Sequence, residues 1–407
     1  MLNPRTIEIV KATVPILEQH GELLTRHFYT RMFRHNPEVA PLFNPSHQAA
    51  GTQQNALAAA ICAYAANIDN LEVLGGAVEL IAQKHASLRI LPEHYPIVGA
   101  NLLGSIADML GERATDEVLA AWEEAYGFLA DILIARERQI YSEHAGSKHG
   151  WEGFKLFRIT RKAPESEIIT SFYLEPVSGE GVPLFQPGQY LTVRVPHPRN
   201  GTTMRNYSIS SAPGGGCFRI SVKRESEGFA SNYLHGLPEG SEIEVGPPCG
   251  EFFLDPTEHD ERPLALLSAG VGVTPMLSML LSTLDSQPGR DIHFIHGALN
   301  GRTHAFRDLV RDLSRQHRQL KVHYRYNKAT VEDQRNQHHD SEGLIDAVLL
   351  ESLLPTRDAD YYFCGPKPFM IAIYQVLRKW GIPASQVHFE FFGPRQELES
   401  VAASAIA

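Results

Sequence analysis

The chain has few cysteines for its length. Its 407 residues include four, at the widely separated positions Cys62, Cys217, Cys249 and Cys364. No two of them have the close paired spacing that a disulfide framework or a zinc site requires. We therefore expect free thiols and a reducing compartment, with the cytoplasm as the predicted location.

An excess of basic charge and a long apolar run are also absent. Lys plus Arg number 37 against 47 Asp plus Glu, a net charge of -10, which argues against non-specific binding to nucleic acid or anionic membranes. The N-terminus has no apolar signal core, and the most apolar stretch, Leu264 to Leu284, is interrupted by glycines and a proline. We expect small molecules as partners and no stable membrane association.

The first third of the chain has a helical period. Apolar residues recur every three to four positions, as at Leu24 and Phe28, which places them on one face of a helix. The same period predicts further helices over 53–65, 72–88 and 122–140. This part of the chain should therefore form an all-α domain.

The pattern changes after residues 145–153, a stretch rich in Gly, Ser, Lys and His that we interpret as a linker. Short alternating runs separated by Pro- and Gly-rich turns follow, which is typical of a small antiparallel barrel. In the last third, strands and helices alternate, as in a parallel α/β sheet. The sequence therefore predicts a multidomain protein: an all-α domain over 1–144, an antiparallel β-barrel over 151–259 and an α/β parallel-sheet domain over 262–407.

One histidine, His85, lies on the apolar face of the helix predicted over 72–88. It follows Val78, Ile81 and Ala82 on that face. A histidine in such a place is more often a hydrogen-bonded core residue than a metal ligand, because imidazole has many structural uses. On the residues alone, both interpretations stay open.

Glu137 falls on the apolar stripe of the last predicted helix, with Leu133 and Ile140. A carboxylate there needs a buried partner or a way out to water. Its alternative is an ion pair with Arg136 or Arg138 at the surface.

Short motifs stand out in the rest of the chain. Arg205 to Ser208 lies in a barrel segment, and Gly228 to Leu234 precedes a helix. Gly270 to Pro275 joins an apolar strand to a helix that we predict to begin near Met276, and Cys364 to Pro366 ends a later strand. Glycine lets a pyrophosphate approach the backbone closely at the start of a helix. Each motif alone is common, and Gly228 to Leu234 by itself fits an ordinary serine cap.

Taken together and in this order, the motifs resemble the flavohaemoglobin family, and the resemblance covers the whole chain. Its globin signatures correspond to Met32-Phe33, Asn36-Pro37-Glu38, Leu42-Phe43-Asn44 and Lys84-His85. Its reductase signatures, those of the ferredoxin-reductase superfamily, correspond to Pro187-Gly188-Gln189-Tyr190 and Arg205-Asn206-Tyr207-Ser208. The resemblance implies haem b iron, FAD and NAD(P)H as cofactors.

The resemblance also implies how the iron is held. His85, preceded by Lys84, becomes the proximal ligand, and Phe43 packs on the porphyrin. Glu137 accepts the outer ring N–H of His85, and Tyr95 is the partner of Glu137. Such a carboxylate favours the activation of oxygen over its storage. As an alternative, Tyr95 merely packs beside the proline that follows it.

On the opposite side of the haem, the resemblance places Tyr29 and Gln53. A phenol and an amide donate hydrogen bonds to oxygen bound at the iron, which carries partial negative charge. Leu57, one turn after Gln53, restricts the pocket. The alternatives are a core tyrosine with its hydroxyl bonded elsewhere and a glutamine on a solvated helix face.

In the reductase, the resemblance presents Arg205 to a flavin phosphate, Tyr207 to the isoalloxazine face and Ser208 to a flavin edge atom. The family often has glutamine at the position of Asn206. The predicted flavin site also includes Tyr190, Asn206, Gly228 and Ser231. The predicted nicotinamide site comprises Gly270, Val271, Gly272, Val273, Thr274, Pro275, Cys364, Gly365 and Pro366. The C-terminal segment of the site comprises Glu390, Phe391, Phe392, Gly393 and Pro394, with Phe391 against the flavin and Glu390 tuning its potential.

The activity implied is that of a nitric oxide dioxygenase. Hydride passes from NAD(P)H to FAD, single electrons pass to haem iron, and nitric oxide and O2 give nitrate, a detoxification. The alternatives are a haem-based sensor of O2 or nitric oxide, and an NADH-dependent reductase of peroxide, ferric or quinone acceptors. Arg302 follows the strand Ile292 to His296 without a basic cluster, which favours NADH over NADPH. We expect a monomer.

Overall fold

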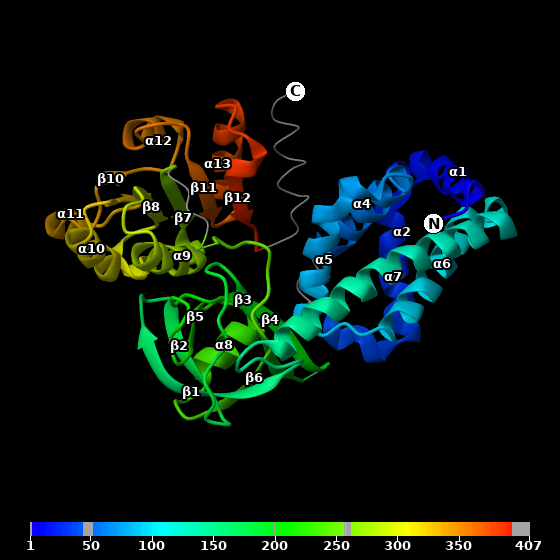
Figure 1. The fold of residues 1–407 in the computed structure, drawn as a ribbon, viewed down its shortest axis with the longest axis horizontal. Helices are drawn as coiled ribbons and strands as arrows, with labels where there is room; N and C mark the ends of the chain where they lie inside the picture. Colours follow the sequence, from blue (N-terminus) through cyan, green and yellow to red (C-terminus); the bar gives the residue numbers. More distant parts are fainter. Residues whose placement is uncertain (1, 44–51, 199, 256, 258–261, 393–407) are drawn as a thin grey trace. The chain divides into compact units, whose positions relative to one another are not determined.

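The computed structural model describes residues 2–43, 52–198, 200–255, 257 and 262–392 (Figure 1). The chain divides into two compact units. The first comprises Met1–Gly146, Trp151–Gly153 and Arg194–Arg205, and the second comprises Ser147–Gly150, Phe154–Val193 and Asn206–Ala407.

The first unit contains the predicted helices. In chain order they are α1 (Pro4–Ala12), α2 (Val14–His35), η1 (Pro37–Leu42), α4 (Thr52–Ala66), η2 (Leu71–Leu74), α5 (Gly75–Leu88), α6 (His94–Leu110), η3 (Gly111–Arg113) and α7 (Asp116–Gly146). The helix predicted over 72–88 starts as the 3₁₀ turn η2, a tightening common at helix ends. The linker predicted over 145–153 begins too early, because α7 continues to Gly146 and so includes the first two residues of that stretch. No described helix is both long and apolar enough to cross a membrane.

Two apolar clusters fill the helical unit. One brings α2, α4, α6 and the start of α7 together around Phe28 and Met32. The other lies where α5, α6 and α7 meet, around Ala82, Ala86 and Leu133. The helical periodicity predicted these inward faces, because residues three or four apart lie on the same side of a helix.

The first sheet along the chain is antiparallel. Its strands are β1 (Lys155–Pro164), β2 (Ile169–Pro176), β3 (Tyr190–His197), β4 (Gly201–Ser208), β5 (Phe218–Lys223) and β6 (Glu242–Val245). They lie in the order β4-β3-β6-β1-β2-β5. Ile209, just after β4, bridges Ile220 of β5, which joins the two edges of the sheet. The predicted antiparallel barrel is therefore confirmed, and helix α8 (Phe229–Gly236) follows β5.

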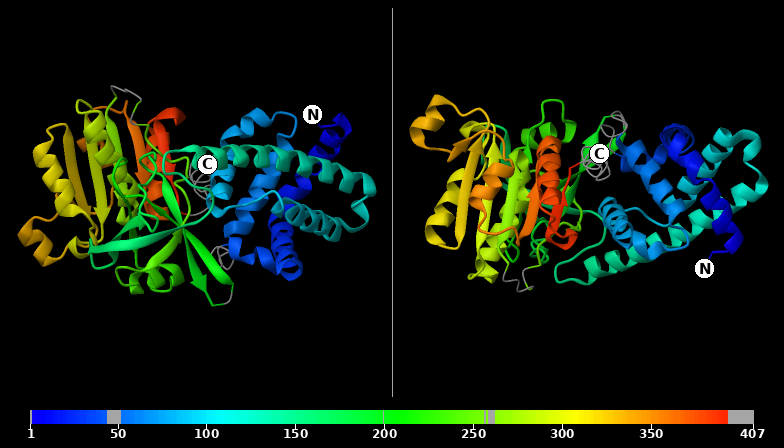
Figure 2. Two further views of the ribbon diagram at one scale, coloured as in Figure 1. Left: turned by 60° about the horizontal axis from the view of Figure 1, so that its bottom comes forward. Right: turned by 90° about the horizontal axis from the view of Figure 1, so that it is seen from above.

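The second sheet is parallel (Figure 2). Its strands are β7 (Leu264–Ala269), β8 (Ile292–Ala298), β9 (Leu320–Tyr326), β10 (Ser341–Glu342), β11 (Asp360–Cys364) and β12 (Val387–Glu390). Their order is β10-β9-β8-β7-β11-β12. The intervening helices are η4 (Gly270–Gly272), α9 (Val273–Ser286), η5 (Gly301–Thr303), α10 (Arg307–Gln316), α11 (Val331–Asn336), α12 (Ala347–Leu353), α13 (Lys367–Lys379) and η6 (Ala384–Gln386).

Both faces of the parallel sheet are buried. Leu264 and Leu266 of β7 pack with residues of α9 and α10. Ala265 and Leu267, which point the other way, pack with residues of α12 and α13. This accounts for the near-continuous apolar runs from which the strands were predicted. Helix α9 begins at Val273, before the predicted start, because a proline is tolerated in the first helical turn.

Candidate functional site

Three side chains meet where α5, α6 and α7 come together in the helical unit. His85 lies in the last turn of α5, Tyr95 in the first turn of α6 and Glu137 within α7. Nδ1 of His85 lies 2.7 Å from Oε1 of Glu137, and the Tyr95 hydroxyl donates to the same oxygen over 2.5 Å. Glu137 is 1% exposed, so it is not a surface partner of Arg136 or Arg138. Because the Tyr95 hydroxyl donates to Glu137, the alternative that Tyr95 merely packs beside the following proline is wrong.

The hydrogen bonds of His85 assign its ring nitrogens different roles. A carboxylate only accepts, so Nδ1 carries a proton, and in the neutral ring the lone pair is on Nε2. Within the described residues, Nε2 has no hydrogen-bond partner, and the side chain is 31% exposed. A ring with a carboxylate on one nitrogen and an open lone pair on the other is the usual form of a metal-bound histidine. These residues therefore fit a haem iron held by His85.

Tyr95 is held as a donor. Burial raises the pKa of Tyr95, and its hydrogen bond to Glu137 raises that pKa further. Tyr126 donates to the backbone oxygen of Tyr95 over 2.7 Å, which fixes the first turn of α6. In the described part of the chain, the second carboxylate oxygen of Glu137 is buried without a hydrogen-bond partner. The contacts of this carboxylate are therefore concentrated on the oxygen that faces His85.

Tyr29 is buried in α2 among aromatic rings. Its ring centre lies 5.0, 5.9 and 5.7 Å from those of Phe28, Phe33 and Phe43. Burial raises the pKa of Tyr29, and among the described residues its hydroxyl has no hydrogen-bond partner. A buried donor without an acceptor is costly. The hydroxyl therefore fits a ligand that accepts a hydrogen bond, and the alternative of a core tyrosine bonded elsewhere finds no support.

Gln53 and Leu57 lie one turn apart near the start of α4, and both are half-buried. Leu57 belongs to the same apolar cluster as Phe43. Gln54, which the sequence pattern did not single out, is buried. Gln53 was predicted because it lies four residues before Leu57 on the same helix face. The burial of Gln54 depends on how the first turn of α4 packs against its neighbours, which the sequence pattern does not show. Lys84 is exposed on α5.

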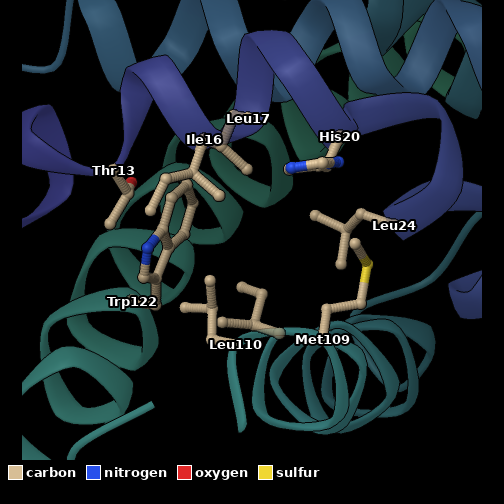
Figure 3. A pocket seen from close by; sticks show the side chains of 9 residues that line it. Thr13, Ile16, Leu17, His20, Leu24, Met109, Leu110 and Trp122 are labelled. Carbon is tan, nitrogen blue, oxygen red and sulfur yellow. The ribbon is translucent and has the colours of Figure 1, made fainter. Parts of the chain in front are cut away.

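A separate apolar pocket lies between α2, α6 and α7 (Figure 3). Its cavity volume is about 20 Å³, enough for one molecule about the size of water. Leu24, Met109 and Trp122 contribute to its wall, with His20 beside them. None of the residues that the resemblance assigns to the haem lines it, so this is not the predicted haem pocket.

The predicted flavin motif forms the end of β4. Nη1 of Arg205 donates to the backbone oxygen of Met204 over 2.7 Å. Thr192 of β3 donates to Oδ1 of Asn206 over 3.1 Å, and Ser208 is buried. Since side chains alternate along a strand, Asn206 and Ser208 share one side of β4, and Arg205 lies on the other.

Tyr190 at the start of β3 has partners that the sequence reasoning missed. Its backbone exchanges hydrogen bonds of 2.9 and 3.0 Å with Cys249. Gly250 has a positive φ of 117°, and an added Cβ would lie 2.9 Å from the Tyr190 ring. The turn that ends in Cys249-Gly250 after two prolines was the signal that could have located them.

The Gly228 segment forms the start of α8, with Gly228 as its N-cap residue. Oγ of Ser231 accepts from the backbone N–H of Glu225 over 3.2 Å and donates to the backbone oxygen of Gly228 over 3.1 Å. Ser231 therefore ties α8 to the turn before it, but the N-cap residue is Gly228 and, among the residues described, no side chain caps the helix, so the alternative of an ordinary serine cap is wrong. The first N–H groups of a helix lack acceptors within it, so this geometry is compatible with a phosphate as well.

The two predicted nicotinamide motifs come together at the carboxyl ends of β7 and β11. A Cβ added to Gly272 would overlap the backbone oxygen of Cys364. A Cβ added to Gly365 would lie 3.2 Å from that of Ala269. Only glycine fits at the Gly272 contact, and the Gly365 contact is tight. Nucleotides bind at such strand ends in open α/β sheets.

The last described strand, β12, ends at Glu390, which pairs with Cys364. Burial raises the pKa of the Cys364 thiol, and the charge of Glu390 adds to this. Phe391 is half-buried and Phe392 exposed. Three residues of the predicted motifs lie outside the described residues: Asn44, Gly393 and Pro394.

Two further expectations concern Arg302 and the cysteines. Arg302 is paired with Glu167 at 3.4 Å on the exposed surface. The pair places a carboxylate beside this guanidinium, and the preference for NADH stays a prediction. All four cysteines are free thiols.

Comparison with known proteins agrees with this organisation. Three family models match in order: Globin over residues 26–133, Oxidoreductase FAD-binding domain over 157–254 and Oxidoreductase NAD-binding domain over 266–375. A flavohemoprotein of Rhodopirellula baltica is 48% identical over 98% of this chain and 100% of its own. A flavohemoprotein of Pseudomonas aeruginosa is 47% identical, with 98% and 100% covered.

Solved structures show the same likeness. A flavohemoglobin of Malassezia yamatoensis with bound FAD and heme matches with a TM-score of 0.86 and 25% identity, over 96% of this chain and 100% of its own. The FAD/NAD-binding domain of a nitric oxide dioxygenase from Vibrio cholerae matches with a TM-score of 0.53 and 33% identity, over 59% and 99%.

These matches confirm the predicted globin, FAD-binding and NAD-binding domains, and haem, FAD and NAD(P)H as cofactors. The protein is an NAD(P)H-dependent oxidoreductase in which electrons pass from NAD(P)H through FAD to haem. With nearly half of its residues shared over the full length, the chain belongs to the flavohemoprotein family.

Proposed function

We propose that this oxidoreductase is a nitric oxide dioxygenase that combines nitric oxide with O2 to give nitrate. The observation that carries the proposal is the 2.7 Å contact between Nδ1 of His85 and Oε1 of Glu137, within a chain that also carries its own reductase. A binding protein or sensor needs neither the carboxylate nor a continuous electron supply. The Vibrio cholerae relative, named a nitric oxide dioxygenase, supports the same activity.

The electron balance explains the reductase. Nitric oxide plus O2 plus one electron gives nitrate, so the two electrons of a hydride serve two nitrates. When bound, FAD accepts the hydride and releases electrons singly, and haem iron takes one electron at a time and binds the diatomic substrate. All other contributions come from the side chains and backbone of this chain.

On the proximal side, we assign His85 as the iron ligand through Nε2. Glu137 holds the proton on Nδ1 and increases the electron density on the ring, which favours oxygen activation. Tyr95 donates to Glu137 and so keeps that carboxylate in place.

On the other side, we assign Tyr29 as the donor that stabilises negative charge on the reacting oxygen. A hydrogen bond to a charged acceptor contributes roughly 1.5–3 kcal/mol. Gln53 is the second donor, and the apolar side chains of Phe43 and Leu57 exclude water from the reaction.

In the reductase, we assign Arg205, Tyr207 and Ser208 to the flavin. The turn after β7, from Gly270 to Pro275, takes the nucleotide pyrophosphate at the start of α9. Cys364 to Pro366 closes the same site. We propose 1–144, 151–259 and 262–407 as the domain bounds, with α7 extending the first of them to Gly146, and a cytoplasmic monomer.

The test is the yield of nitrate relative to the NADH consumed. Reduced holoprotein in aerated buffer receives nitric oxide in small portions, and nitrate and NADH are measured together. The proposal predicts two nitrates for each NADH. NADH consumption with peroxide as the product, and no nitrate, would show an oxidase or acceptor reductase instead. No consumption at all would favour the sensor.

A further inference from the structure

A second polar contact joins the two helices that carry His85 and Glu137. Arg136, immediately before Glu137 on α7, makes two hydrogen bonds to Glu79 of α5. Its Nε donates to Oε2 over 2.6 Å and its Nη2 donates to Oε1 over 2.8 Å. This is the paired geometry that only an arginine offers to a carboxylate. The hydrogen bonds from Arg136 also lower the pKa of Glu79, so the pair stays charged.

A third contact lies on the other side of Glu137. The hydroxyl of Tyr141 on α7 donates to the backbone oxygen of Ile90, just after α5, over 2.5 Å. The contacts therefore run in the same order along both segments: positions 79, 85 and 90 meet positions 136, 137 and 141. The bond between His85 and Glu137 is bracketed by a contact on each side.

Large and small apolar side chains both occur where α5 packs against α7. Leu133 and Ile140 of α7 are buried there, together with Ala82 and Ala86 of α5 and Ala130 of α7. The alanine side chains interlock little with the facing helix, and helices position each other by such interlocking. The polar contacts therefore add to the apolar packing in setting the position of α7 along α5.

We propose that the pair of Arg136 and Glu79 positions Glu137 against His85. By holding α7 against α5, it keeps Oε1 of Glu137 at hydrogen-bond distance from Nδ1 of His85. Arg136 and Glu79 are positioning residues, since neither touches the imidazole. The inference rests on the proposed function, in which His85 ligates the iron.

The energetics separate this role from simple stabilisation. The side chains of Arg136 and Glu79 are 27% and 26% exposed, and partly exposed ion pairs contribute little to folding. Replacing Arg136 should therefore leave a folded protein. A hydrogen bond weakens steeply as its geometry worsens, so a small shift of α7 should still change the electronics at His85.

The test is resonance Raman spectroscopy of the full-length holoprotein, reduced with dithionite. In Arg136→Met, the iron-histidine stretching band should move to lower frequency. The shift should be at least half as large as that caused by Glu137→Gln. Arg136→Lys, which keeps the charge but not the paired geometry, should fall between Arg136→Met and wild type. The matched control is Arg138→Met at an exposed position on the same helix, which should leave the band in place.

A double variant excludes a general loosening of the fold. In the Glu137→Gln background, Arg136→Met should cause no further shift, because the two changes act on one hydrogen bond. An unchanged band in Arg136→Met, or the same added shift in both backgrounds, would overturn the inference. This measurement does not depend on nitrate formation, so it can succeed or fail independently of the proposed activity. An iron-histidine band retained in His85→Ala would show that His85 is not the iron ligand.

Discussion

The helical unit and the nucleotide-binding sheet build their sites in different ways. In the helical unit the chemistry lies in side chains: an imidazole, a carboxylate and a phenol from three helices meet at Oε1 of Glu137. In the sheet the site is shaped by backbone: Gly272 lies against the backbone oxygen of Cys364. We therefore expect that a functional side chain can be removed from the first with the fold intact, whereas a single added methyl group obstructs the second.

Histidines show the same difference. His85 is partly exposed and bonded to a carboxylate. His296 in β8 is fully buried, bonded to Ser268 over 2.8 Å, with the ring of His304 4.6 Å away. Burial lowers the pKa of His296 to about 3, so it stays neutral and serves packing. The residue type alone does not indicate the role; the groups around it do.

The largest expected effect is that of His85→Ala. It removes the only strong ligand that we assign to the iron, so haem content and the Soret band should fall while FAD is retained. Absorbance spectra of the purified protein give both quantities. Retention of five-coordinate, histidine-ligated haem would contradict the assignment.

Arg205→Ala should do the reverse, lowering FAD occupancy while dithionite-reduced haem still binds carbon monoxide.

Gly272→Ala should be nearly as severe, but in the other half of the chain. The added Cβ would overlap the backbone oxygen of Cys364, so the turns after β7 and β11 must separate. Reduction of FAD by NADH, followed by stopped flow, should be largely lost, with haem content unaffected. Gly289→Ala is the control, because an added Cβ there meets no atom within 4 Å. Normal flavin reduction in Gly272→Ala would show that the contact is dispensable.

A smaller effect concerns acid stability of the second unit. The unfolded chain takes up a proton at His296 near its ordinary pKa of 6.5, whereas the folded chain does so only near pH 3. The contribution of neutral His296 to the free energy of unfolding is therefore full above pH 6.5 and is lost as the pH falls toward 3. The loss is roughly 2 kcal/mol at pH 5. His296→Gln should reduce the loss between pH 7 and pH 5 in urea unfolding followed by FAD fluorescence. His20→Gln, at an exposed position, is the control; an equal loss in His296→Gln and wild type would assign the sensitivity elsewhere.

Much of the helical site follows from sequence, but its contacts do not. The apolar stripe predicted that Glu137 points inward. Whether it has a buried partner, reaches water or pairs with a neighbouring arginine could be decided only from the packing of α5 against α7. The periodicity of α4 selected Gln53 and missed Gln54, because which side chain of a first turn is buried depends on the neighbouring helices. In the sheet, glycine motifs predicted where a nucleotide binds, but the contact between Gly272 and Cys364 joins distant parts of the chain and was not predicted.

Tyr29→Phe tests a side chain whose ring packs while its hydroxyl acts. The change removes one hydrogen bond to a charged acceptor, worth roughly 1.5–3 kcal/mol, and keeps the aromatic contacts. Dioxygen should dissociate at least several-fold faster from the ferrous protein, and nitric oxide turnover should fall. Carbon monoxide, which carries less charge when bound, should respond less. An unchanged oxygen dissociation rate would mean that Tyr29 does not reach the ligand.

The most direct measurement compares the iron-histidine stretching band of the ferrous protein with that of Glu137→Gln. The substitution keeps the size of the side chain and removes the charge that faces Nδ1 of His85. We expect a lower stretching frequency and a higher haem potential, with haem and FAD contents near normal. The same band in both proteins would contradict the claim that this buried carboxylate tunes the iron.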